Sequence, residues 1–285
     1  MAMSLRQLPE AKTFQRPQNF QWDAPSDVLS KWAEMPMAAD TSDDSTITMF
    51  EVIGEDWWTG GGVTAKRIAA ALRSIGDKDV TVKINSPGGD MFEGIAIYNL
   101  LRAHKAKVTV EVLGYAASAA SIIAMAGDEI RMGLGTFMMV HNAWGVVIGN
   151  RHDMREAATL FDGFDSAIVD IYEARTGMKR ADIEKLMDAE TFMGPSEAVK
   201  NGFADEVDND LSAPEGDAKN TDRGLMARRQ TEAALARAGF SRDKRSELLA
   251  EMGVTAAQRD ASRTPAARDA GFEAAARQFI DILKS

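Results

Sequence analysis

The feature that most limits the fold of this chain is a regular alternation of short β-branched runs and longer helical runs between residues 47 and 207. The short runs are rich in Val, Ile and Thr, and in the longer runs the apolar residues recur at helical spacing. Strands joined through helices pair in parallel with right-handed crossovers. The pattern therefore predicts an α/β domain. The predicted strands cover 47–54, 80–85, 107–114, 129–133 and 136–144, and the predicted helices between them cover 62–76, 91–104 and 118–127.

A further helical run, residues 151–175, follows the last of these strands. Met154, Phe161, Phe164 and Ile168 lie on one stripe of this run, which is too apolar for a solvated connection. We therefore expect the helix to pack against other parts of the protein and to favour self-association.

The segments on either side of the α/β domain differ from it in composition. Residues 1–45 contain several prolines and scattered aromatic residues and end in a polar run, which is typical of an extended arm. Residues 209–220 have the composition of a linker. Residues 221–285 form a tail rich in Ala and Arg, with helical composition and few large apolar side chains. The predicted organisation is an arm, a domain over 46–208, a linker and a helical tail.

The charge of the chain excludes some classes of function. The 33 Lys and Arg residues against 43 Asp and Glu residues give a net charge of −10, which argues against a direct nucleic-acid partner. The tail holds 12 basic against 9 acidic residues, so an acidic protein partner or the acidic face of another subunit is expected there. The sequence contains neither the apolar core of a secretory signal nor a run that could span a bilayer. We expect a cytoplasmic protein with no membrane partner.

Cysteine is absent, and the three histidines are His104, His141 and His152. Without cysteine the chain can form no disulfide, no thiolate metal site and no cysteine nucleophile. His104 and His152 lie in charged helical runs, where solvent contact is expected. We expect neither a metal nor another cofactor.

A serine lies where a predicted strand passes into a predicted helix. Ser118, in GYAASAAS (114–121), is surrounded by Gly and Ala, which leave room for a substrate backbone. A serine on such a turn can expose its hydroxyl near the N-terminus of a helix. The alternative is that Ser118 or Ser121 caps that helix.

Two further motifs follow predicted strands. NSPGGD (85–90) contains paired glycines, which can bring N–H groups close to a ligand, although a simple Pro–Gly turn has the same composition. His141, in MMVHNAWG (138–145), comes 23 residues after Ser118 and is either a core histidine or a base facing the same cleft. The carboxyl ends of parallel strands are where open α/β sheets place their sites.

These motifs, in this order and at these separations, resemble those of the ClpP-like serine peptidases. The resemblance covers about residues 47–207 and includes a fourth segment, AETFMGPSEAVKNGFADEV (189–207). It implies a ClpP/crotonase-type fold, which is a spiral of ββα units with a protruding handle helix over residues 151–175. It also implies homo-oligomeric rings that pair through their handles.

The resemblance implies a role for each matching residue. The nucleophile of the family falls on Ser118 and its general base on His141, while the N–H groups of its oxyanion hole fall on Gly89 and Ala119. The positions assigned to substrate binding are Gly88 and Asn142.

The acid of the implied triad departs from the family pattern. An alignment without a gap puts Glu190 where the family has an aspartate, and Asp188 is the alternative acid. A glutamate can orient an imidazole as an aspartate does. Either residue can also be an ordinary surface acid.

The flanking segments extend the resemblance. A ClpP-like core with an arm and a basic Ala/Arg-rich tail resembles the head-maturation proteases of phages and prophages. These cleave scaffold and capsid precursor proteins during procapsid maturation, in the cytoplasm of the bacterial host or inside the procapsid. No GxxxxGK[ST] motif occurs, which fits an ATP-independent serine endopeptidase.

Three other functions stay open on the sequence. The chain could be a general ClpP-type subunit that works with a Clp ATPase. It could be an acyl-CoA enzyme, because the crotonase fold combines glycine-rich oxyanion N–H groups with a glutamate base. It could also be a scaffold or assembly protein with a vestigial protease core.

Overall fold

The computed structural model divides the chain into two compact units. The first comprises Met1–Ala24, Thr41–Glu55 and Gly62–Ala213, and the second comprises Pro25–Asp40, Asp56–Gly61 and Pro214–Ser285. The residues that the structure describes are 20–22, 28, 44–55, 62–211, 223–241, 244–245 and 247–249. Most of the predicted arm, most of the predicted linker and the tail beyond residue 249 therefore lie outside the described residues.

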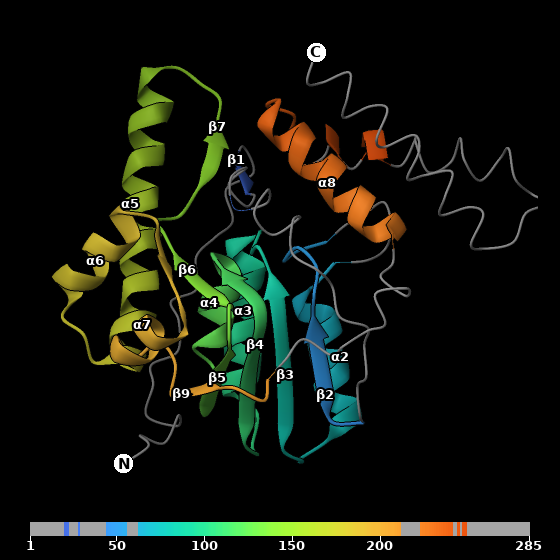
Figure 1. Ribbon diagram of the computed structural model, residues 1–285. Coiled ribbons are helices and arrows are strands. Elements are labelled where there is room, and N and C mark those ends of the chain that lie inside the picture. The colour runs from blue at the N-terminus through green and yellow to red at the C-terminus, as the bar shows by residue number, and fades with distance from the viewer. Residues whose placement is uncertain are drawn as a thin grey trace, which may run out of the picture. The chain divides into compact units, whose positions relative to one another are not determined.

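A seven-stranded sheet forms the centre of the first unit (Figure 1). Five of its strands follow one another in the order β2-β3-β4-β5-β9, and each neighbouring pair runs parallel. The predicted α/β class with a parallel sheet is confirmed. The five strands are β2 (Thr46–Met49), β3 (Val80–Ser86), β4 (Val108–Ala117), β5 (Glu129–Gly133) and β9 (Glu206–Asp208).

Strand β4 pairs with two different strands along its length. Its residues 109–112 pair with β5, and its residues 115–117 pair in parallel with β6 (Phe137–Val140). Strand β8 (Thr191–Met193) then adds to the other side of β6 in the antiparallel direction. The end of β4, the end of β6 and the start of β8 are thereby brought to one edge of the fold.

Each helix expected in the α/β domain is present, and most are shorter than the sequence pattern suggests. The sequence pattern did not predict two helices and three strands of this domain, four of which have only three to six residues. The helices of the first unit are α2 (Ala65–Ile75), α3 (Met91–Arg102), α4 (Ala119–Ala124), α5 (Arg151–Thr176), α6 (Arg180–Asp188) and α7 (Pro195–Lys200). The elements missed are β7 (Gly145–Val147), α6, β8, α7 and β9.

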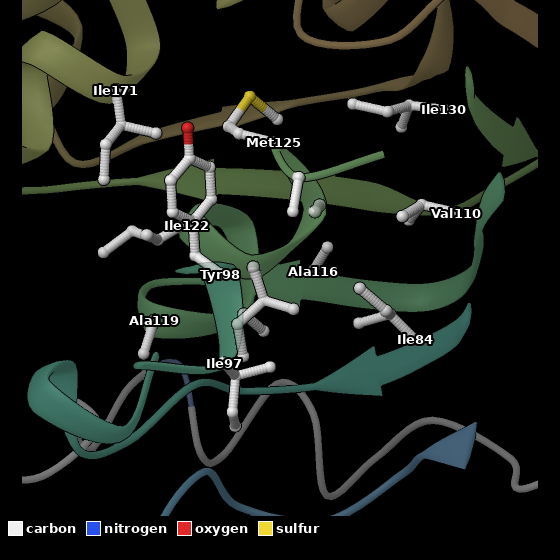
Figure 2. Packing of buried hydrophobic residues seen from close by; sticks show 14 of the residues in the cluster. Ile84, Ile97, Tyr98, Val110, Ala116, Ala119, Ile122, Met125, Ile130 and Ile171 are labelled. Carbon is white, nitrogen blue, oxygen red and sulfur yellow. The ribbon is translucent and has the colours of Figure 1, made fainter. Parts of the chain in front are cut away.

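The hydrophobic core joins the parallel strands to the helices (Figure 2). The first half of β4 alternates between buried and partly buried residues, and its second half is buried throughout, as is usual for a strand covered on both faces. The labelled members of this cluster include Ile84, Val110 and Ile130 of the strands and Ile97, Tyr98, Ile122 and Ile171 of the helices, each no more than 2% exposed.

Helix α5 changes character along its length. Residues 151–160 are exposed apart from Ala157, whereas Phe164 to Tyr172 include six buried side chains that face the core. In Figure 1 the first part of α5 extends away from the sheet together with β7. The expected packing of this helix thus applies to its second half, and its first half has the form of the handle that the resemblance implies.

A short piece of the predicted arm is part of the first unit. Strand β1 (Phe20–Trp22) pairs antiparallel with β7, with Phe20 opposite Val147. The sequence gives no strand signal there, because three residues are too few to show alternation. The pairing covers an edge of β7, which would otherwise present unpaired backbone groups.

The second unit contains a helix in the region of the predicted helical tail. Helix α8 (Arg223–Arg237) buries Ala233 and Leu235, and Thr231 is also buried. Farther along the chain Leu249 is buried as well. The described part of the tail thus includes a helix with buried side chains.

The core assignment predicts unequal effects for two leucines. Leu101 in α3 is 1% exposed, whereas Leu134, between β5 and β6, is 66% exposed. We expect Leu101→Ala to lower the free energy of unfolding by about 2–5 kcal/mol because it removes buried methyl groups and leaves a cavity. Leu134→Ala should change it by less than about 0.5 kcal/mol. If urea denaturation showed equal losses of unfolding free energy in the two variants, the core described above would be contradicted.

Candidate active site

Ser118 occupies a strained turn between β4 and α4. Its φ of 55° and ψ of −125° are unusual for a residue with a side chain. Its N–H donates to the carbonyl of Met139 on β6 at 3.0 Å, and its own carbonyl accepts the N–H of Ser121 at 2.9 Å and the Ser121 hydroxyl at 2.6 Å. The side chain of Ser118 makes no capping bond to α4. The capping role is therefore excluded for Ser118.

His141 follows the last residue of β6 and meets Ser118 directly. Its side chain is buried, and its Nε2 lies 2.6 Å from Oγ of Ser118. When Nε2 carries no proton, the serine hydroxyl donates to it. This is the geometry that a general base needs to activate a serine nucleophile.

The glycine turn after β3 lies against the serine turn. Gly88 and Gly89 have φ values of 87° and 143°, which side chains rarely adopt. A Cβ on Gly88 would lie 2.6 Å from Cβ of Ser118 and 2.5 Å from the carbonyl oxygen of Ala117, and one on Gly89 would overlap the carbonyl of Ile53. Gly88 must therefore be glycine for the turn to approach Ser118, and Gly89 must be glycine for the turn to approach Ile53.

The serine and the histidine open into one pocket. Polar and apolar atoms form its walls in nearly equal parts, and its polar side chains include Ser118, His141 and Asn142. The predicted oxyanion residues Gly89 and Ala119 line it as well, and Gly88 packs directly behind Ser118. The remaining lining residues are Met91, Ile122, Ala143, Trp144, Ile168 and Tyr172.

Glu190 lies in the turn between α6 and β8. Its side chain is exposed, and its backbone has a φ of 47°. The antiparallel register pairs Val140 with Thr191, so the next pair in that register is His141 with Glu190. The recorded pairing ends at Val140 and Thr191, so Glu190 lies one residue beyond it, as His141 does on the other strand.

Asp188 is also exposed and has a defined partner. Its Oδ1 accepts the side-chain N–H of Asn142 at 2.8 Å. Asn142, the predicted substrate-binding residue, therefore both lines the pocket and contacts the alternative acid.

Sequence reasoning missed two residues of this region. Tyr172 of α5 is fully buried, and its hydroxyl lies 2.7 Å from Oγ of Ser121; burial raises its pKa. Asp165, also on α5, accepts the N–H of Ala143 at 2.6 Å. An acidic residue between Phe164 and Ile168 on the apolar side of a helix is the signal that could have pointed to Asp165.

The structure does not bring the other two histidines to the pocket. Nε2 of His104 lies 2.7 Å from the carbonyl oxygen of Lys78, and His152 is exposed in the first turn of α5. Within the described ranges, no group of His, Asp and Glu side chains could hold a metal ion. In the same part of the chain, no helix has both the length and the apolar character to cross a bilayer.

The family of the chain follows from comparison with known proteins. The Clp protease family model matches residues 63–210, which include the serine turn, the glycine turn and both candidate acids. The chain belongs to the Clp protease family. Members of this family are serine endopeptidases, and the resemblance to ClpP-like peptidases is thereby confirmed.

Two relatives of this Clp-family chain show how far the likeness extends. The ATP-dependent Clp protease proteolytic subunit of Deinococcus radiodurans is 34% identical over 133 residues, which is 46% of this chain and 65% of that protein. The chain thus matches just under two thirds of that relative. The structure of a ClpP1 mutant from Listeria monocytogenes shares the fold, with a TM-score of 0.50 and 22% identity over 59% of this chain and 93% of that one.

The contact between the two turns predicts different outcomes for two glycine substitutions. Gly88→Ala adds a Cβ that collides with Ser118, whereas Gly135→Ala, at a φ of 75°, adds one with nothing within 4 Å. Both replacements carry the backbone strain of a positive φ. We expect only Gly88→Ala to abolish labelling of the protein by a fluorophosphonate probe. Normal labelling of a folded Gly88→Ala variant would contradict the packing of this turn on Ser118.

Proposed function

We propose that this protein is a serine endopeptidase in which Ser118 is the nucleophile and His141 the general base. The 2.6 Å contact between Ser118 Oγ and His141 Nε2 carries the proposal, because it joins a nucleophile to a base beside an open pocket. Ser118 attacks the peptide carbonyl while His141 takes its proton. His141 then gives that proton to the leaving amine, and water releases the acyl group by the reverse sequence.

The negative charge that develops on the substrate oxygen needs donors on the pocket wall. Ala119 is the first residue of α4, so its N–H has no partner within the helix ladder, and Gly89 brings its backbone close because it has no side chain. In our proposal these two N–H groups form the oxyanion hole. A donor of this kind contributes roughly 3–4 kcal/mol to stabilisation of the transition state.

We assign the third position of the triad to Glu190. The strand register supports it, because Glu190 and His141 each lie one residue beyond the last recorded pair of β6 and β8, Val140 and Thr191. Ser118 and Glu190 are also the two residues other than glycine with a positive φ among those that the structure describes. Backbone strain of this kind gathers at functional sites. Asp188, in contrast, holds the side chain of Asn142.

In this proposal the enzyme works without an ATPase in the maturation of a phage procapsid, and scaffold and capsid precursor proteins are its substrates. The basic Ala/Arg-rich tail, the arm and the absence of a GxxxxGK[ST] motif support it. The place of action is then the cytoplasm of the bacterial host or the procapsid interior. Family members form homo-oligomeric rings, and we extend this assembly to the present chain.

A second candidate function is that of a general Clp proteolytic subunit. The similarity to the Deinococcus radiodurans protein, which is named an ATP-dependent Clp protease proteolytic subunit, favours it. The two functions differ in one observable property. A Clp ATPase with ATP should leave the rate of protein cleavage unchanged if the phage function is correct and raise it if the second candidate is correct.

The nucleophile is tested by Ser118→Ala. We expect the wild-type protein, incubated alone, to cut its own flanking segments and to react with a fluorophosphonate probe, because proteolytic cleavage generally concentrates at chain termini and loops outside a folded core. Ser118→Ala should do neither, and Ser74→Ala, which changes an exposed serine on α2, should do both. Mass spectrometry of the three proteins measures both reactions. Labelling or self-cleavage that persists in Ser118→Ala would exclude Ser118 as the nucleophile.

The acid is tested by comparing Glu190→Gln with Asp188→Asn. Each change keeps the shape of the side chain and removes its charge. We expect Glu190→Gln to lower kcat by roughly 100-fold or more, because the imidazolium loses the carboxylate that stabilises it. Asp188→Asn should lower it by less than about 10-fold. The opposite ranking in peptide hydrolysis would move the assignment to Asp188.

A further inference from the structure

Two carboxylates from different helices hold the segment that carries His141. Asp165 of α5 accepts the backbone N–H of Ala143 at 2.6 Å, and Asp188 at the end of α6 accepts the side-chain N–H of Asn142 at 2.8 Å. All three residues of the segment 141–143 line the pocket. The two carboxylates therefore fix both the end of β6 and one wall of the pocket.

The surroundings of Asp165 disfavour a negative charge. Its partial burial is the main reason that its pKa rises from 3.8 to about 6. The carboxylates of Asp162, one turn earlier on α5, and of Asp188, on α6, raise this pKa as well, while the N–H of Ala143 lowers it. An asparagine has the same shape and could accept the same hydrogen bond without a charge. Stability alone thus does not explain an acid at this position.

We propose that Asp165 is a positioning residue for His141, whose carboxylate anchors the Ala143 amide and keeps the histidine segment in place against the nucleophile. The inference rests on the serine-peptidase function proposed above. A hydrogen bond to an ionised acceptor is shorter and stronger than one to a neutral acceptor, so the anchor holds best in the ionised state. Protonation of Asp165 then loosens the segment that carries the base.

This arrangement has a consequence for the pH dependence of activity. His141 must be neutral to accept the serine proton, and Asp165 must be ionised to hold the segment. Two groups therefore have to lose a proton before the enzyme is active, so log kcat/KM should fall on the acid side with a slope above 1 and toward about 2. Replacement of Asp165 by asparagine leaves one such group and a slope of about 1.

Ionisation of the Asp165 carboxyl has opposite effects on activity and on folding stability: it supports activity, and it lowers the stability of the folded protein. Because its pKa is higher in the folded protein than in the unfolded chain, the folded state binds more protons between about pH 4 and pH 6. Stability from this group is present below that window and is lost as the pH rises through it. Asp165→Asn should therefore raise the melting temperature at neutral pH and change it little near about pH 4.

The test combines Asp165→Asn, Asp165→Ala and the control Asp162→Asn in the full chain. We expect Asp165→Asn to reduce the acid-side slope to about 1, and Asp165→Ala to lower kcat/KM by roughly 10- to 100-fold because the segment shifts. Asp162→Asn removes a neighbouring charge that has no bond to Ala143. Asp162→Asn should therefore move the acid side of the curve of log kcat/KM against pH to lower pH without a change of its slope. An unchanged slope in Asp165→Asn, or full activity in Asp165→Ala, overturns the proposal.

A second measurement does not depend on peptidase activity. Hydrogen exchange of the peptide that contains Ala143, corrected for intrinsic rates, should show protection that decreases below about pH 6 in the wild type and not in Asp165→Asn. Exchange that is the same in the two proteins across this range also overturns the proposal. A wild-type protein that neither reacts with the fluorophosphonate probe nor cleaves peptides would instead refute the peptidase function. The exchange experiment would still decide whether Asp165 anchors the Ala143 amide.

Discussion

The candidate site depends on the pairing of the last residues of β4 with β6. Residues 115–117 leave the neighbourhood of β5 and join β6 in parallel, and the bond from the Ser118 N–H to the Met139 carbonyl continues this pairing by one residue. The strand end that carries the serine and the one that carries His141 are thereby locked side by side. A break in these few backbone bonds would separate the two side chains even if every other part of the sheet stayed intact.

Strained backbone conformations and close contacts between turns occur together around the candidate site. Ser118 and Glu190 have positive φ values, and Gly88 leaves room for the serine turn to come within contact distance. Such conformations cost free energy, so the surrounding structure must determine them. Here the hydrogen bonds of Ser121 to the Ser118 carbonyl and the packing of the α4 core supply that support. The stable parallel sheet thus supports an edge that would not be stable by itself.

Sequence patterns predicted the strands and helices whose apolar residues recur with a regular period. Long buried strands such as β4 and helices of ten or more residues such as α5 are evident because their apolar residues follow a period, and the order of the motifs made Ser118 and His141 candidates. Contacts made by residues outside these motifs were not evident. The bond from the Ala143 amide to Asp165 spans 22 residues and depends on the angle at which α5 meets the end of β6, which no local pattern encodes.

Helix α5 links the proposed site to the part of the molecule that projects from it. Its buried half brings Tyr172 to Ser121 and Asp165 to Ala143, so one element supports both the nucleophile turn and the histidine segment. Its exposed half carries Met154 and Leu160, which are 42% and 37% exposed. A second subunit that covered these side chains would stabilise the helix as a whole, since helix formation is cooperative. Assembly would then strengthen the two contacts that hold the Ser118–His141 pair together, without touching either residue.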